Sequence, residues 1–379
     1  MGLALGAGGV LGGAWLAGAL AALARETGWD PRRASHLLGT SAGSVFAALL
    51  GAGVPVSRLW PPVVADSEEW ILARLARSSS YRFPERLPRL RPGSWELMRA
   101  GLRHPGGLWP LAKLLAGLVP RGMISTHPIR ETVRAATRRG WARHPRCWVV
   151  ACDYRDGSRV VFGRPGAPAT QLADAVAASC SIPGFFQPAW IRGRAYVDGG
   201  LNSPSNLDLL AGERLDLVIC LNPLSSRYTD PGLAPLRKAE EAVSWLAARQ
   251  VDEEAKALRR KGTRVVLIEP TAYDLVAIGG NRMDPRRCRL VFEVAVRSVA
   301  RQLREPQVRS LLSAVLSCGR DLQKPPPGRG DPLHPADPVR VPARAEDGRQ
   351  AGDRRRGQRP RVHLRRAVRR RAQSRRAPA

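Results

Sequence analysis

Short apolar runs alternate along the first 322 residues with longer segments in which apolar positions recur every three or four residues. The short runs are expected to form strands at residues 2–5, 36–38, 147–152, 159–162, 194–197, 215–221 and 263–269. The periodic segments are expected to form helices at residues 15–26, 45–52, 56–76, 125–138, 172–178, 236–261, 285–303 and 306–322. This alternation is typical of an α/β domain.

One part of the chain breaks the pattern, because residues 77–121 contain six prolines and a series of arginines interleaved with aromatic residues. Such a mixture can rest on a membrane interface or stack on nucleic acid. It is equally compatible with an irregular helical cap whose aromatic side chains are simply buried. Both interpretations remain open from the sequence.

The hydrophobic pattern stops at Lys324, after which Pro, Gly and Arg dominate. The chain has a net charge of +29; residues 1–324 contribute +18 (45 Lys and Arg against 27 Asp and Glu) and residues 325–379 contribute +11 (16 against 5). We therefore predict a folded domain over 1–323, with its motifs in 1–210, and a disordered basic tail over 324–379. The arginine excess suits a polyanionic partner, although a GC-rich genome explains it as well.

The six cysteines contain no Cys-x-x-Cys pair, and most lie inside apolar runs. We expect reduced core thiols in a cytoplasmic protein and no zinc site. No segment has the roughly 18 uninterrupted apolar residues that a membrane-spanning helix requires. Residues 1–24 lack a basic start, so they are interpreted as the first strand, loop and helix rather than a signal peptide.

The strongest single motif is Gly39-Thr40-Ser41-Ala42-Gly43, which follows an apolar run and precedes a helix-compatible segment. Strand, sharp turn and helix in this order form a nucleophile elbow with Ser41 at the corner. Gly39 and Gly43 leave room where a tight turn excludes Cβ atoms. The helix dipole favours an anion at the corner by only about 0.3–1 kcal/mol, so Ser41 also needs a base. A plain Gly/Ser turn capping the helix is the simpler alternative.

A second glycine-rich segment, residues 6–12, follows the first predicted strand and precedes the first predicted helix. Backbone N–H groups at such a helix start can hold an anion. A dinucleotide pyrophosphate is disfavoured because the spacing of the Rossmann fingerprint requires a glycine at position 11, where this chain has leucine. The nearby elbow favours the oxyanion of an acyl-transfer intermediate, for which each donor is worth about 2.7–4 kcal/mol.

Asp198 directly follows the predicted strand 194–197 and begins the turn Asp198-Gly199-Gly200. Strand ends that run into loops often carry catalytic groups, and Asp153 has a similar position. Ordinary Asp-Gly turn chemistry explains either residue equally well.

The ordered set of glycine loop, Ser41 elbow and Asp198 turn resembles the patatin-like phospholipase family over about residues 1–270. The resemblance implies a three-layer α/β/α fold with a mostly parallel central sheet and a helical cap. It implies that Ser41 is the nucleophile and Asp198 the base. It also implies an oxyanion hole from the backbone of Gly6, Gly8, Gly9 and Val10, with Gly39, Gly43, Gly199 and Gly200 completing the motifs.

The resemblance further implies a lipid or phospholipid ester as substrate, neither metal nor cofactor, and no specific nucleic acid. Contact with an anionic membrane from its inner, cytoplasmic side is expected in addition. The sequence departs from the family at Leu11, where the family usually carries Lys or Arg, and at Ala7, which replaces a frequent glycine.

Aspartate is a weak base for an alcohol, since its ordinary pKa is about 3.9. Burial that raises this pKa, or proton transfer concerted with attack, would remove the difficulty. A Ser-His-Asp triad is the competing arrangement, and its candidate histidines are His36, His104, His127 and His144. The competing class of function is a basic protein that binds membranes or nucleic acid on a degenerate hydrolase fold.

Overall fold

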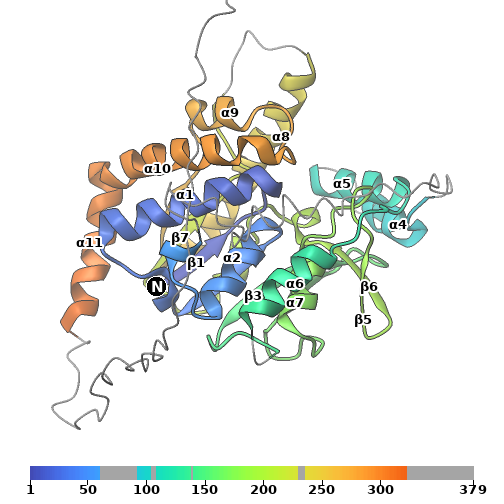
Figure 1. The fold of residues 1–379 in the computed structure, drawn as a ribbon, viewed down its shortest axis with the longest axis horizontal. Coiled ribbons are helices and arrows are strands. Elements are labelled where there is room, and N and C mark those ends of the chain that lie inside the picture. The colour runs from blue at the N-terminus through green and yellow to red at the C-terminus, as the bar shows by residue number, and fades with distance from the viewer. Residues whose placement is uncertain (60–91, 104–107, 138–139, 229–234, 322–379) are drawn as a thin grey trace, which may run out of the picture. The chain divides into compact units, whose positions relative to one another are not determined.

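A computed structural model of the chain describes residues 1–59, 92–103, 108–137, 140–228 and 235–321. Its core is a single sheet in which the described strands follow the order β5-β6-β3-β2-β1-β7-β8, with β4 paired to β3 (Figure 1). The strands are β1 (Gly2–Leu5), β2 (His36–Thr40), β3 (Cys147–Asp153), β4 (Arg159–Phe162), β5 (Ala189–Ile191), β6 (Arg194–Asp198), β7 (Leu217–Leu221) and β8 (Arg264–Ile268).

Strand direction divides this sheet into two parts. β3, β2, β1, β7 and β8 are parallel to their neighbours in this series. β4 and β6 run antiparallel to β3, and β5 runs antiparallel to β6. The sheet is therefore mostly parallel, with a reversed edge that brings the end of β6 back along β3.

Helices cover one face of the sheet through the larger hydrophobic core. Alternate strand residues such as Leu3, Leu37 and Ile219 pack there against helices on that side. These helices are α1 (Gly9–Thr27), α2 (Ala42–Gly51), α6 (His127–Ala136), α7 (Leu172–Ser179), α9 (Ala272–Ile278), α10 (Cys288–Arg304) and α11 (Pro306–Asp321). In Figure 1, α10 lies along α1.

The opposite face uses the intervening strand residues, among them Ala4, Leu38 and Val218. They pack against Val251, Ala255 and Leu258 of α8 (Pro235–Arg260) and against the short 3-10 helix Leu207–Leu210. A sheet buried on both faces needs apolar residues at nearly every position, which is why its parallel strands read as continuous hydrophobic runs. The three-layer α/β/α architecture is confirmed.

Two further helices, α4 (Trp95–Arg103) and α5 (Leu108–Leu118), pack against each other within the predicted cap region. The remaining short 3-10 helices are Pro31–Arg33, Val56–Arg58, Gly199–Leu201 and Pro285–Arg287. The helix predicted over 56–76 begins instead with a 3-10 turn, and the rest of it from residue 60 lies outside the described residues, as does the predicted disordered tail.

Sequence periodicity missed β5 and α9. Both elements are short, at three and seven residues, so neither displays a full period of its pattern. Within the described residues, no helix is both long and apolar enough to span a membrane.

Candidate active site

The register of β3 brings the ends of β2 and β6 to the same level. Thr40 of β2 is opposite Val150, and Asp198 of β6 is opposite the next residue, Ala151. Ser41 directly follows β2 and Asp198 is the last residue of β6, so the two residues meet although 157 positions separate them in the sequence. The Ser41 side chain lies close enough to the Asp198 carboxylate to lower the pKa of that carboxyl.

Ser41 has the backbone conformation of an elbow nucleophile, with φ 52° and ψ −123° at the N-terminus of α2. Positive φ in a residue other than glycine is strained and persists only where its surroundings hold it. A Cβ on Gly43 would lie 2.0 Å from the carbonyl oxygen of Leu5, and one on Gly39 would lie 2.5 Å from the Cα of Ser44. The turn therefore requires both glycines, as the sequence indicated.

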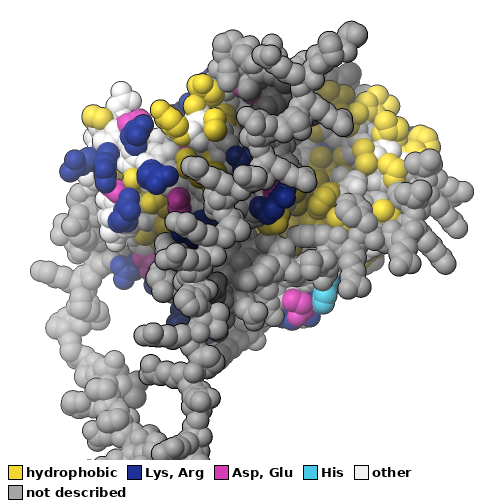
Figure 2. Space-filling view, turned by 45° about the horizontal axis from the view of Figure 1, so that its top comes forward, with side chains coloured by type: hydrophobic (Ala, Val, Ile, Leu, Met, Phe, Trp, Pro, Cys, Tyr) yellow, Lys and Arg dark blue, Asp and Glu magenta, His cyan; other side chains and the backbone are white. Residues whose placement is uncertain are grey.

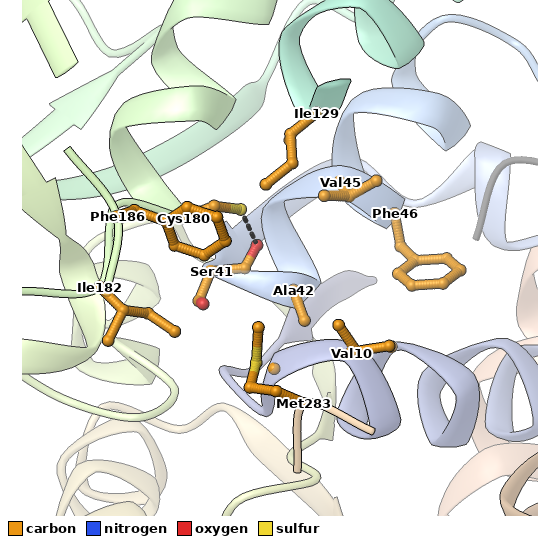
Figure 3. A pocket seen from close by; sticks show the side chains of 12 residues that line it. Val10, Ser41, Ala42, Val45, Phe46, Ile129, Cys180, Ile182, Phe186 and Met283 are labelled. Carbon is orange, nitrogen blue, oxygen red and sulfur yellow. Dashed lines mark hydrogen bonds between the residues drawn. The ribbon is translucent and has the colours of Figure 1, made fainter. Parts of the chain in front are cut away.

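The C-terminal end of α7 holds the backbone of both residues. The Ser41 N–H donates to Ser179 Oγ at 2.9 Å, and the Ser179 hydroxyl donates onward to the Val150 carbonyl at 2.6 Å. Cys180 Sγ contacts the Ser41 carbonyl at 3.3 Å (Figure 3), and the Asp198 N–H donates to the Ser181 carbonyl at 3.0 Å. Three consecutive residues thus set the positions of the nucleophile and the carboxylate.

Asp198 is buried, and burial raises the pKa of its carboxyl to about 6. The neighbouring Ser41 side chain and a hydrogen bond from the Gly200 N–H at 2.7 Å oppose this rise in pKa because they stabilise the charged form. The carboxylate is thus a stronger base than ordinary aspartate and is still ionised at neutral pH.

The glycine loop lies beside Ser41 at the start of α1. Among the hydrogen bonds of the described residues, none uses the N–H groups of Gly8, Gly9 or Val10, whereas the Leu11 N–H donates to the Arg282 carbonyl at 2.9 Å. Gly9 has φ +66°, the left-handed conformation that favours glycine. These N–H groups of Gly8, Gly9 and Val10 remain available to an anion.

Gly6 has a different role from the one expected, since its N–H is not free to act as an oxyanion donor. Its N–H already donates to the Leu221 carbonyl at 2.9 Å, and its own carbonyl accepts from the Gly43 N–H at 3.1 Å. A Cβ at this position would lie 1.9 Å from the side-chain oxygen of Asn222. Gly6 therefore joins the loop to the elbow by close backbone contact.

An apolar pocket of about 520 Å³, open solvent at its mouth included, adjoins Ser41 (Figure 3). Besides Ser41, its lining is Gly9, Val10, Gly13, Ala42, Val45, Phe46, Ile129, Cys180, Ile182, Phe186 and Met283. The pocket suits a flexible hydrocarbon group better than a charged one.

The histidines proposed for a triad bond elsewhere in the described structure. His36 is buried, its Nε2 lies 3.0 Å from Glu213, and burial lowers its pKa. His127 is exposed at the start of α6, and His144 bonds the Ala34 carbonyl. His104 lies outside the described residues. Thus the described histidines have partners other than Ser41.

Asp153, the other carboxylate at a strand end, has a structural role in the turn that follows β3. Its Oδ1 accepts from the Arg155 N–H at 2.8 Å, and its Oδ2 accepts from Arg194 at 3.3 Å.

Sequence reasoning did not single out Ser179 or Asn206. The Asn206 side-chain amide donates to Thr40 Oγ1 at 3.1 Å, to the Ser203 carbonyl at 2.9 Å and to the Gly199 carbonyl at 3.4 Å. Such contacts leave no signal in local sequence, apart from the tolerance of asparagine for the left-handed φ of 51° that Asn206 adopts.

Metal ligation has no support in the described part of the chain, where no group of three His, Cys, Asp or Glu side chains gathers. The five cysteines that the structure describes are free and buried, and burial raises the pKa of the Cys147 and Cys152 thiols to about 12.

Comparison with known proteins identifies a family model, described as patatin-like phospholipase, that matches residues 3–211. This range includes the glycine loop, the elbow and the Asp198 turn. Among solved structures, the chain is similar to VipD from Legionella pneumophila, with 15% sequence identity, a TM-score of 0.33, and coverage of 85% of this chain and 75% of that one.

Proposed function

The chain belongs to the patatin-like phospholipase family, and from this premise we propose that it is a serine acyl hydrolase that cleaves ester bonds of lipids. We assign Ser41 as the nucleophile, Asp198 as the base, and the N–H groups of Gly8, Gly9 and Val10 as the oxyanion hole. The observation that carries the proposal is the position of Ser41 beside the buried Asp198 carboxylate and next to an apolar pocket.

In the first half of the reaction, Ser41 Oγ attacks the ester carbonyl while its proton moves to the Asp198 carboxylate. The tetrahedral oxyanion accepts hydrogen bonds from the loop N–H groups. When the intermediate collapses, the carbon–oxygen bond to the alcohol breaks and Asp198 returns its proton to the departing oxygen. An acyl ester on Ser41 remains.

Water completes the reaction. Asp198 removes a proton from the water as its oxygen attacks the acyl carbonyl, a second oxyanion occupies the same N–H groups, and Ser41 Oγ leaves with the proton from Asp198. The fatty acid departs and the enzyme returns to its starting state without a metal or cofactor.

The dyad requires further stabilisation of the transition state, because a carboxylate whose conjugate acid has a pKa of about 6 is a far weaker base than the alkoxide of Ser41. Concerted proton transfer avoids a free alkoxide, and general acid–base catalysis of this kind typically raises the reaction rate about 10²–10⁴-fold. Each loop donor adds about 2.7–4 kcal/mol of transition-state stabilisation. The loop therefore carries much of the catalysis.

The pocket supports lipid specificity, since hydrocarbon gains about 0.8 kcal/mol for each buried CH₂ group. We place the acyl chain of the substrate between Val45, Phe186 and Met283. Lipids with long chains are held in membranes, so we further propose that the enzyme meets its substrate at an anionic membrane surface on the cytoplasmic side.

The test is covalent labelling by a fluorophosphonate together with turnover of a short p-nitrophenyl ester. Ser41→Ala should abolish both, and Asp198→Asn should abolish turnover, with circular dichroism spectra unchanged. Asp153→Asn is the matched control, since it also alters a buried carboxylate at a strand end, and it should keep turnover. Wild-type turnover by Ser41→Ala or Asp198→Asn would refute the dyad. A protein that only binds membranes or nucleic acid would show neither labelling nor turnover.

A further inference from the structure

Helices α4 and α5 form an antiparallel hairpin with unusually close backbones. A Cβ on Gly101 would lie 2.6 Å from the Pro110 carbonyl oxygen, and a Cβ on Gly117 would lie 2.7 Å from the Met98 nitrogen. Because so little space separates the two helices, their larger side chains must point either toward the rest of the protein or away from it.

The inner side of the hairpin is fixed to the sheet region. Leu97 of α4 and Ala116 of α5 are buried against Cys152, Tyr154 and Val197. The Ser94 hydroxyl, just before α4, donates to the Tyr154 carbonyl at 2.8 Å. The hairpin is therefore attached to the folded core, and its outer side is held in a defined direction.

The hairpin exposes large apolar side chains on both helices. Five large hydrophobic side chains, each at least 50% exposed, form what we name the hairpin face: Trp95, Leu102, Leu111, Leu115 and Leu118. The last three recur at i, i+4 and i+7, so they form one stripe along α5. Figure 2 shows hydrophobic side chains gathered at the right of the molecule, where Figure 1 places α4 and α5. An exposed apolar patch of this kind marks an interaction surface.

The segments that carry the hairpin face also carry basic residues. Residues 92–103 and 110–124 contain four basic side chains, Arg99, Arg103, Lys113 and Arg121, and one acidic side chain, Glu96, a balance of +3. The three arginines are exposed. Exposed apolar side chains that include a tryptophan, with exposed arginines on the same segments, match the boundary of an anionic bilayer, where hydrocarbon meets phosphate groups.

The hairpin also adjoins the pocket beside Ser41. A Cβ on Gly184 would lie 2.4 Å from Val119, the residue after α5, and one on Gly122 would lie 2.3 Å from the Phe186 carbonyl oxygen. Phe186 pairs with Ile124 in an isolated parallel bridge and lines the pocket together with Ile182. The segment that leaves α5 thus packs on one wall of the pocket.

We propose that the hairpin face docks the protein on an anionic phospholipid surface, with Arg99 and Arg103 at the phosphate groups and the leucines of α5 in the hydrocarbon boundary. The inference rests on the proposed function and identifies the surface through which this enzyme meets its lipids. A second copy of the chain is a poorer occupant, because a two-fold contact would bring together two surfaces whose segments each have a net positive charge.

Binding is tested on the full chain carrying Ser41→Ala, so that no lipid is hydrolysed during the measurement. Cosedimentation uses vesicles of phosphatidylcholine alone and of phosphatidylcholine mixed with phosphatidylglycerol. Adding Leu111→Ser, Leu115→Ser and Leu118→Ser should weaken partitioning onto mixed vesicles about tenfold or more. The matched control is Tyr273→Ser with Val276→Ser, which removes two exposed apolar side chains of α9 and should leave partitioning unchanged.

The charge arm uses Arg99→Gln with Arg103→Gln, which should weaken binding to the mixed vesicles and leave binding to pure phosphatidylcholine unchanged. Every variant keeps residues 325–379, with their charge of +11, so differences between variants report on the hairpin. The triple serine variant that retains Ser41 should keep wild-type turnover of a soluble ester, which shows that it is folded.

Unchanged vesicle binding by the folded triple serine variant would overturn the proposal. So would a wild-type dimer that the same substitutions convert to a monomer without affecting vesicle binding, because the face would then bind a second copy. Failure of the proposed function has a separate signature, since it appears as hydrolysis that survives Ser41→Ala or as a wild-type protein without turnover. In the second case an unchanged circular dichroism spectrum shows that the triple serine variant is folded, so the vesicle measurement still decides the proposal.

Discussion

The side-chain amide of Asn206 donates to the Thr40 hydroxyl at 3.1 Å and thereby connects the residue before Ser41 to the loop that follows Asp198. The same amide reaches the carbonyl of Gly199, the residue after Asp198, at 3.4 Å. A single buried side chain therefore contacts the immediate neighbours of both proposed catalytic residues. We expect Asn206 to act as a positioning residue.

Asn206→Ala should lower kcat for a soluble ester about tenfold to a hundredfold, because small misplacements of reacting groups are costly. KM and the pH profile should change little, since neither the pocket nor the Asp198 environment is altered. Thr40→Val removes one of the three acceptors and should have a smaller effect. Steady-state kinetics checks both variants, and wild-type kcat in Asn206→Ala would exclude a positioning part for Asn206.

The raised pKa of Asp198 predicts the pH dependence of turnover. With a carboxyl pKa of about 6, the base is protonated in acid, so kcat/KM should fall as the pH drops below about 6 and stay level above it. A pH series on a soluble ester measures this profile. A profile that stays flat down to pH 4 would mean that this carboxyl is not the base.

The same pKa predicts that the catalytic carboxylate reduces stability. The pKa of the Asp198 carboxyl is about 6 in the folded state and about 3.9 in the unfolded state. The contribution of this carboxyl to stability is therefore fully present below the unfolded pKa and is lost as the pH rises through 6. Asp198→Asn should therefore raise the free energy of unfolding at pH 7 by about 2–3 kcal/mol. Urea denaturation at pH 7 and pH 4 tests this expectation, since the gain should disappear at the lower pH. Destabilisation at pH 7 would contradict it.

The close approach at Gly43 predicts a large and local effect on stability. In Gly43→Ala the new methyl group would lie 2.0 Å from the Leu5 carbonyl oxygen, and the backbone would have to shift to relieve this clash. We therefore expect the free energy of unfolding to fall by about 3 kcal/mol or more. Gly212→Ala is the matched control, because no atom lies within 4 Å of its added Cβ, and it should change stability by less than about 0.5 kcal/mol. Equal urea midpoints for the two variants would show that the contact is not required.

The position of Met283 in the pocket wall allows a test of whether the pocket binds the acyl chain of the substrate. Its side chain lines the pocket opposite the elbow, so Met283→Trp should fill space that a long acyl chain needs (Figure 3). We expect kcat/KM for a long-chain p-nitrophenyl ester to fall about tenfold or more, while the acetate ester is affected much less. Comparing the two esters on one protein makes the shorter ester its own control. Equal losses for both would place the acyl chain elsewhere.

Local sequence determined most of the secondary structure and the stereochemistry of the motifs. The apolar runs became strands because a sheet covered on both faces buries nearly every side chain, and Gly39 and Gly43 specified an elbow because only glycine fits their contacts. The short elements β5 and α9 escaped prediction because periodicity needs length.

Only the tertiary structure decided which groups meet at Ser41. The reversal of β6 against β3 returns Asp198 to the level of Thr40, and burial in that position, rather than anything in the Asp-Gly-Gly turn, raises its pKa. Likewise Ser179 and Asn206 reach the elbow from distant segments, while Gly6 loses its free N–H to Leu221. Partners far apart in sequence depend on strand register and long-range packing, and neither is encoded in a local pattern.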